Sequence, residues 1–211
     1  MKSKLLKISF AITICSIWFA HAAAQSTTTA GVRLSALWFT PELMDGRYNS
    51  YLGTGLGFSA GIFFEDQLKP RLISVAEIGF TRLGTEVAVS HYSGGGHGGY
   101  GSVSSSFNGK VHFDYLSLSA GVKYFLSDRL FGYPFLDVSR SVDGSVKINK
   151  TTYHAGLRFG YKFYSFDINL GYVYGLKNQG SVYSNEAGSG TGLNHRNRYW
   201  QGSVSIPIRK F

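Results

Sequence analysis

The feature that most constrains the fold of this chain is the alternation of apolar residues with small or polar residues, which recurs in eight separate segments. In one of the clearest, Leu157, Phe159 and Tyr161 alternate with Arg158 and Gly160. A period of two residues is typical of a β-strand with two different faces. The segments that follow the pattern are 32–38, 52–64, 72–81, 116–124, 136–139, 153–163, 166–174 and 200–208. Most of them are longer than the soluble-protein average of about 5–6 residues per strand.

Composition supports an all-β chain and excludes other classes. Glycine accounts for 27 of the 211 residues, phenylalanine for 16 and tyrosine for 14, whereas there are only 4 prolines. Charged residues make up 16%, against about 25% in ordinary soluble domains. The aromatic content argues against disorder, and the shortage of charge argues against a helical bundle. After residue 24 no run of 18 apolar residues remains, so no transmembrane helix is expected.

The two strand faces decide between a soluble and a membrane barrel. One face carries large apolar side chains, and the other carries mainly glycine, serine, threonine and single charges. Eight closed strands enclose room only for side chains or one small ligand, which large apolar residues on every strand would overfill. The apolar face is therefore expected to point outward into lipid. The sequence predicts an eight-stranded antiparallel up-and-down transmembrane β-barrel.

Connection lengths agree with that topology. The expected short connections are Glu65–Pro70, Ser127–Gly132 and a turn near Tyr164–Ser165. The expected long connections are 40–50, 83–109, 141–150 and 175–194. Short and long connections alternate, as in a barrel with both termini on the periplasmic side and long loops outside.

The first 24 residues have the features of an export signal. Lys2, Lys4 and Lys7 precede an apolar stretch over 8–20, and Ala24 ends a small-residue run suited to signal peptidase. The expected division is a signal peptide at 1–24 and an outer-membrane β-barrel domain at 25–211. We therefore expect the mature protein in a Gram-negative outer membrane, after cleavage near Ala24.

Two features could suggest other fates for the chain. Its net charge is +9, but the basic residues are scattered and the longest basic run is Arg209-Lys210, so no nucleic-acid partner is expected. The single cysteine, Cys15, lies inside the apolar signal stretch and could be lipidated. Ile14 stands before it where a lipoprotein signal has a small residue, which argues against lipidation.

Three segments carry a family resemblance. Residues 73–80 read ISVAEIGF, 115–125 read YLSLSAGVKYF, and 161–176 end in GYVYGL. In these segments the chain resembles the small outer-membrane β-barrel proteins of the porin-like, PorT-like group common in Bacteroidetes. The resemblance implies the barrel fold and the outer membrane, with membrane lipid and the barrel-assembly machinery as partners. Some members serve secretion, and the resemblance leaves open whether this chain does.

The C-terminal Phe211 resembles the signal read by the barrel-assembly machinery. That signal ends in an aromatic residue preceded by apolar residues at alternate positions, but Ile206 and Ile208 lie an odd number of positions before Phe211. A β-bulge near Arg209-Lys210 would restore the register.

Charged residues on the polar face are the candidate interior residues. They are Arg33, Glu77, Lys123, Asp137, Arg158, Lys162 and Asp167. An unpaired buried ion costs several kcal/mol, so an eight-stranded lumen favours ion pairs. Four basic and three acidic residues fit a paired network better than a selective channel. The alternative is a charged pathway for a solute.

Metal and catalytic sites have weaker support. His91 and His97, with Glu86 and His112, could approach one another only across a glycine-rich loop without ligand spacing. His154 and Ser205 share the polar face but lack a nucleophile motif. The sequence therefore predicts no metal site, no cofactor and no enzyme activity.

The function expected from these patterns is structural or interactional. The barrel would anchor outward loops that contact extracellular or envelope proteins. A narrow solute or ion pore and a lipid-modifying enzyme remain alternatives. A soluble periplasmic ligand-binding barrel would need its faces reversed.

Overall fold

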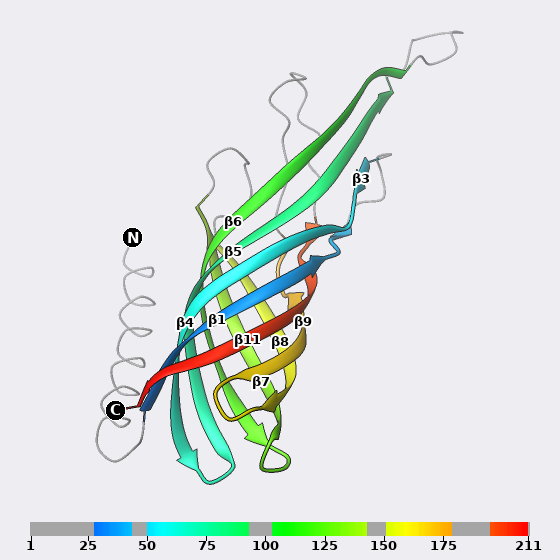
Figure 1. Cartoon of the computed structure of the whole chain (residues 1–211). Coiled ribbons are helices and arrows are strands. Elements are labelled where there is room, and N and C mark those ends of the chain that lie inside the picture. Colours follow the sequence, from blue (N-terminus) through cyan, green and yellow to red (C-terminus); the bar gives the residue numbers. More distant parts are fainter. Residues whose placement is uncertain (1–27, 44–49, 93–102, 143–150, 179–194, 211) are drawn as a thin grey trace, which may run out of the picture.

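The computed structural model describes residues 28–43, 50–92, 103–142, 151–178 and 195–210, which form one closed barrel (Figure 1). Its principal strands are β1 (Thr28–Phe39), β4 (Gly55–Lys69), β5 (Leu72–Tyr92), β6 (Val103–Phe125), β7 (Leu130–Ser141), β8 (Thr151–Lys162), β9 (Asp167–Gly175) and β11 (Arg198–Lys210). They pair antiparallel in the order β5-β4-β1-β11-β9-β8-β7-β6, and pairing of β5 with β6 closes the ring. The predicted eight-stranded antiparallel barrel is confirmed. The predicted signal peptide lies outside the described residues.

Three short strands lie beside this ring. β2 (Glu42–Leu43) pairs with β10 (His195–Arg196), and β3 (Ser50–Leu52) pairs with β5 at Val87–Val89. No helix in the described part of the chain is long and apolar enough to cross a membrane.

Short turns join β4 to β5, β6 to β7 and β8 to β9 at one end of the barrel (Figure 1). The Leu126 amide donates to the Leu130 carbonyl at 2.9 Å, and the Phe163 amide donates to the Phe166 carbonyl at 2.8 Å. The first turn is tighter than predicted, because β4 continues through Glu65 as far as Lys69. This extension brings two further carboxylates, Glu65 and Asp66, onto a strand.

The predicted loop at 83–109 is wrong over much of its length. β5 and β6 remain paired from Leu83↔Phe113 to Tyr92↔Val103. The paired stretch contains four valines and three aromatic residues (Tyr92, Phe107 and Phe113), which favour strands. The glycine-rich run at 94–99 made the whole segment resemble a loop. Because β6 pairs with β7 only from Tyr115 onward, the β5–β6 hairpin projects well beyond the barrel wall (Figure 1).

Exposed apolar side chains form the outer face of the barrel. They include Leu34, Trp38, Phe58, Ile62, Ile78, Leu116, Leu118, Leu136, Val138, Leu157, Phe159, Ile168, Leu170, Trp200, Val204 and Ile206. From Tyr153 to Phe163 the chain advances about 10 residues. With about 3.3 Å per residue and a tilt near 40°, this gives about 25 Å, the height of a lipid-facing band.

The inner face is more aromatic than predicted. Phe131, Tyr133 and Phe135 are all buried inside, on alternate positions of β7. Glycines on β8 provide the space: a Cβ on Gly156 would lie 2.2 Å from Cζ of Phe135, and one on Gly160 would lie 2.3 Å from Cζ of Phe131. Small interior residues therefore allow large ones to fill the lumen.

A register shift occurs near the end of β11. Gly31 pairs with Pro207 and Ala30 pairs with Arg209, which leaves Ile208 as the extra residue of a bulge. The predicted bulge is thus present beside Arg209. Phe211 itself lies outside the described residues.

Candidate functional site

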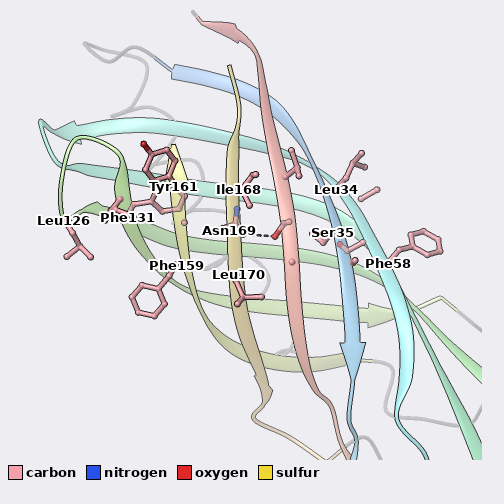
Figure 2. A pocket seen from close by; sticks show the side chains of 18 residues that line it. Leu34, Ser35, Phe58, Leu126, Phe131, Phe159, Tyr161, Ile168, Asn169 and Leu170 are labelled. Carbon is pink, nitrogen blue, oxygen red and sulfur yellow. Dashed lines mark hydrogen bonds between the residues drawn. The ribbon is translucent and has the colours of Figure 1, made fainter. Parts of the chain in front are cut away.

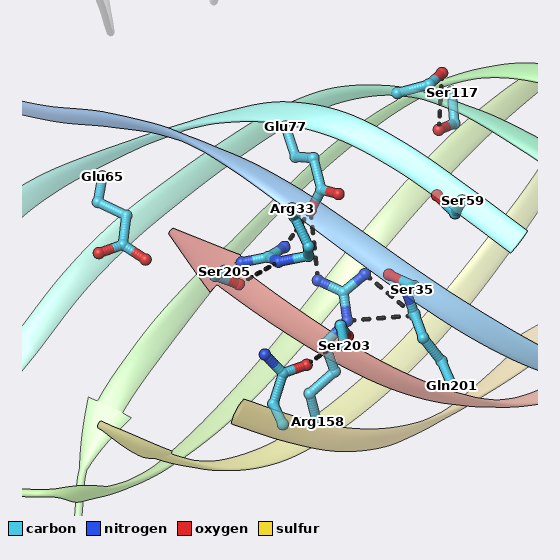
Figure 3. A network of polar contacts seen from close by, with 12 residues as sticks. Arg33, Ser35, Ser59, Glu65, Glu77, Ser117, Arg158, Gln201, Ser203 and Ser205 are labelled. Carbon is cyan, nitrogen blue, oxygen red and sulfur yellow. Dashed lines mark hydrogen bonds and ion pairs between the residues drawn. The ribbon is translucent and has the colours of Figure 1, made fainter. Parts of the chain in front are cut away.

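The middle of the lumen holds two arginines that share one carboxylate. Arg33 on β1 and Arg158 on β8 each donate through Nη1 to Oε2 of Glu77 on β5, and the Arg158 contact measures 3.3 Å (Figure 3). Arg33 is only 1% exposed, and the other two side chains are also buried. The trio therefore connects three walls of the barrel across its centre.

Polar residues of β11 accept further hydrogen bonds from the two guanidinium groups (Figure 3). Arg33 Nε donates to Ser205 Oγ at 2.8 Å, and Arg158 Nη2 donates to Gln201 Oε1 at 3.1 Å. Gln201 Nε2 in turn donates to Ser35 Oγ at 2.8 Å. Because each charge has several partners, the cost of its burial is offset.

Aromatic rings enclose the same guanidinium groups. Arg158 Cζ lies 4.1 Å from the ring centroid of Phe135 and 5.2 Å from that of Tyr133. Arg33 Cζ lies 5.3 Å from the ring of Phe63 and 5.5 Å from that of Tyr133. These cation–π contacts bind the charges to the wall and leave little space between them.

A second layer of charges lies nearer the short turns. Lys123 Nζ donates to Asp167 Oδ2 at 2.8 Å and also to Glu65 Oε1. The same nitrogen lies 4.6 Å from the ring centroid of Phe131. Glu65 is the residue that the sequence interpretation missed. It continues the inward alternation of Gly61 and Phe63, and this was the available signal.

Lys162 is the predicted network residue that the structure places elsewhere. It is exposed at the last position of β8, with Nζ 5.5 Å from the ring centroid of Phe125. Its phase points inward, but the wall ends there and Asp167 pairs with Lys123 instead. The prediction that Lys162 belongs to the buried network is therefore wrong.

A third cluster occupies the other half of the lumen. Asp137 Oδ1 accepts a hydrogen bond from Ser139 Oγ and lies 2.7 Å from Nδ1 of His154. The structure thus places Arg33, Glu77, Lys123, Asp137, Arg158 and Asp167 inside the barrel, in three separate groups. With Glu65 added, three basic residues face four acidic ones in the part of the lumen that the structure describes.

The space between these groups is small. A cavity of about 20 Å³ is lined by Glu77, Asp137, Arg158 and Tyr199, among others. This volume suits about one water molecule. In the described barrel, side chains therefore fill the centre of the lumen.

The residues weighed for catalysis have separate partners. Ser205 Oγ accepts from Arg33, and His154 Nδ1 faces Asp137. No group of three or more possible metal ligands occurs among the residues described. Of the candidate ligands, Glu86 and His112 are exposed on the hairpin, whereas His97 lies outside the described residues.

Outward-facing ion pairs lie on the hairpin near and above the apolar band. Arg82 donates to both carboxylate oxygens of Asp114, through Nε at 2.7 Å and Nη2 at 2.6 Å. Farther along, Lys110 Nζ lies 4.0 Å from Glu86 Oε1, and both side chains are exposed. These charges suit an aqueous or interfacial position rather than hydrocarbon.

Comparisons with known proteins concern the fold. No protein-family model matches the chain, and no curated protein matches it significantly. Among solved structures, OprG from Pseudomonas aeruginosa is 12% identical with a TM-score of 0.47, covering 86% of this chain and 93% of OprG. The attachment invasion locus protein Ail of Yersinia pestis is 14% identical with a TM-score of 0.44, covering 87% and 100%. Neisserial surface protein A is 15% identical with a TM-score of 0.41, covering 86% and 99%.

The closed sheet and the direction of its faces decide the class. Every principal strand pairs on both sides within the barrel, and the outer face between the short turns and the hairpin is apolar. A closed barrel with this outer face is the β-structure that lipid tolerates. The chain is an outer-membrane β-barrel protein. The resemblance to the PorT-like group stays a prediction.

Proposed function

We propose that the barrel is a membrane-anchored platform that presents the β5–β6 hairpin to proteins outside the cell. The projection of this hairpin carries the proposal. Among the described residues, β6 between Val103 and Phe113 pairs only with β5, so its other edge is open. The outer edge of β5 is partly covered by β3 at Val87–Val89.

An open strand edge can bind an extended segment by strand addition. Unpaired backbone amides and carbonyls supply the hydrogen bonds, and neighbouring side chains select the sequence. Over 103–113 the sequence has no proline and one charged residue, Lys110, so few of the features that usually protect an edge are present. A partner protein with an exposed strand is the kind of ligand that this edge fits.

The filled lumen supports a role without transport or catalysis. A solute pathway would have to displace the Arg33–Glu77–Arg158 contacts, and acyl transfer would need a serine hydrogen-bonded to His154 Nε2. Ser139 and Ser205 instead bond to Asp137 and Arg33. We therefore propose a non-catalytic, non-conducting barrel.

Site-specific photo-crosslinking in intact cells tests the platform. A photoreactive residue at Lys110, whose side chain is 76% exposed, should give discrete protein adducts. The same residue at Leu136, on the lipid-facing wall, should give none and serves as the control. Smeared or absent adducts at Lys110 and at other hairpin positions would contradict the proposal.

We also propose that the protein belongs to the PorT-like group and loses its first 24 residues on export. The motifs at 73–80, 115–125 and 161–176 support the first point, and Ala24 with the apolar stretch before it supports the second. Intact-mass measurement of protein recovered from outer membranes tests the cleavage site. A mass that includes residues 1–24 would contradict it.

A further inference from the structure

The outer wall formed by β8, β9 and β11 is hollowed. A groove of about 550 Å³ is lined by outward-facing apolar side chains, including Leu157, Phe159, Leu170, Tyr172 and Trp200. A larger hollow of about 1020 Å³ shares Phe159 and Leu170 with it and reaches Leu34, Phe58 and Gly202 (Figure 2). Together they form one apolar depression on the lipid-facing side.

The strand register explains the depression. Leu170 pairs with Phe159 on one side and with Gly202 on the other, and Gly202 pairs in turn with Ala36. Two adjacent strands thus carry small residues between larger neighbours. A Cβ added to Gly202 would meet no atom within 4 Å, so the space above it is open.

Two arginines lie at the upper rim of this depression. Arg198 pairs with Tyr174, one outward position above the Trp200–Tyr172 pair, and its Cζ lies 4.9 Å from the Tyr174 ring centroid. Arg196 Nη1 donates to the Tyr174 hydroxyl at 2.9 Å. Tyr174 therefore holds both guanidinium groups at the end of the groove.

Among the residues that the structure describes, the rim carries more positive than negative charge. Arg198 is paired with Glu42. Arg196 donates to Asn178 Oδ1 at 2.8 Å and to Tyr174, both of which are neutral, and it has no carboxylate partner among the described residues. One carboxylate of the described chain, Glu42, thus faces two guanidinium groups. The planar guanidinium is well suited to bind phosphate oxygens.

We propose that this wall binds a membrane lipid with an anionic phosphate headgroup. Arg196 and Arg198 bind the phosphate, and the acyl chains lie over Tyr172, Leu170 and Gly202. From Arg198 to Gly202 the strand advances about 13 Å at about 3.3 Å per residue. The positive charge thus lies above the apolar groove, in the same order as the phosphate headgroup and the acyl chains of one lipid molecule.

Quenching of Trp200 fluorescence by brominated lipids tests the proposal. The mature chain carries Trp38→Phe, which leaves Trp200 as the single tryptophan after residue 24. The protein is placed in phosphatidylcholine nanodiscs containing either brominated phosphatidic acid or brominated diacylglycerol. Phosphatidic acid should half-saturate quenching at about a tenfold lower mole fraction, because only it offers a charge-assisted contact.

Matched variants separate the two parts of the site. Arg196→Gln should remove most of the preference for phosphatidic acid. Gly202→Leu should weaken the binding of both lipids by filling the groove, since a Cβ at residue 202 meets no atom within 4 Å. Lys110→Gln and Ala120→Leu make the same kinds of change elsewhere on the exposed surface and should alter neither curve. Heat-modifiable mobility confirms that each variant is folded.

Three results would overturn the proposal. Equal quenching by the two lipids would show that the rim does not discriminate between a charged and a neutral headgroup. If Lys110→Gln lost as much of the preference for phosphatidic acid as Arg196→Gln, the effect would come from net charge and not from the rim. Displacement of phosphatidic acid by millimolar glycerol 3-phosphate would point to a site for free phosphate rather than for lipid.

Discussion

Replacing Glu77 by glutamine should destabilise the barrel more than any matched change on its surface. The substitution keeps the shape of the side chain but removes the carboxylate that Arg33 and Arg158 share. Both guanidinium groups would remain buried, with only neutral partners such as Ser205 and Gln201. Removing one partner of a buried ion pair typically costs about 3–5 kcal/mol.

The surface pair of Glu86 and Lys110 provides the control. Its atoms lie 4.0 Å apart and both side chains are largely exposed, so Glu86→Gln should cost about 0–1 kcal/mol. Unfolding by denaturant in phospholipid vesicles, followed by tryptophan fluorescence and by gel mobility, measures both free energies. The two variants should therefore differ by at least about 2 kcal/mol.

A double variant tests the cause. Adding Arg158→Met to Glu77→Gln removes one of the two uncompensated cations and should recover part of the lost stability, because contacting residues are not additive. Equal stabilities of Glu77→Gln and Glu86→Gln would refute the reasoning. The reasoning would also be refuted if the double variant lost as much stability as Glu77→Gln and Arg158→Met lose together when each is measured alone.

Other parts of the structure give further predictions. Gly156→Val places a side chain against the Phe135 ring and should cost about 1–3 kcal/mol in the same unfolding assay, with partial rescue by Phe135→Leu. Lys123→Gln should destabilise the barrel, whereas Lys162→Gln at the exposed end of β8 should change its stability by less than about 0.5 kcal/mol. Planar-bilayer recordings of the mature barrel should show no discrete current steps, and reproducible steps would support a pore instead.

The strands of the barrel and the direction of their faces were predictable from alternation and lumen size. Residues such as Leu157 and Phe159 follow the period of two without interruption, and lumen size then determines which face points outward. Interior charges were predictable for the same reason, since Arg33, Glu77 and Arg158 lie in the middle of regular strands. Period and phase are local properties that a single sequence contains.

The features that could not be predicted from the sequence depend on where each strand ends and on which residues face each other across neighbouring strands. Lys162 has the same phase as Arg158 but lies at the rim of the barrel. Glu65 lies inside because β4 extends beyond its predicted end. Pairing of aromatic residues with glycines across strands, as at Phe135 and Gly156, requires the register. Register follows from the whole closed sheet and cannot be read from one strand.

Heat-modifiability of the mature protein recovered from outer-membrane fractions tests the central claim most directly. A closed, lipid-embedded barrel resists detergent until it is boiled. The unheated sample should migrate faster than the boiled one in a denaturing gel. A protein found soluble in the periplasm, with the same mobility before and after boiling, would contradict the outward direction of the apolar face.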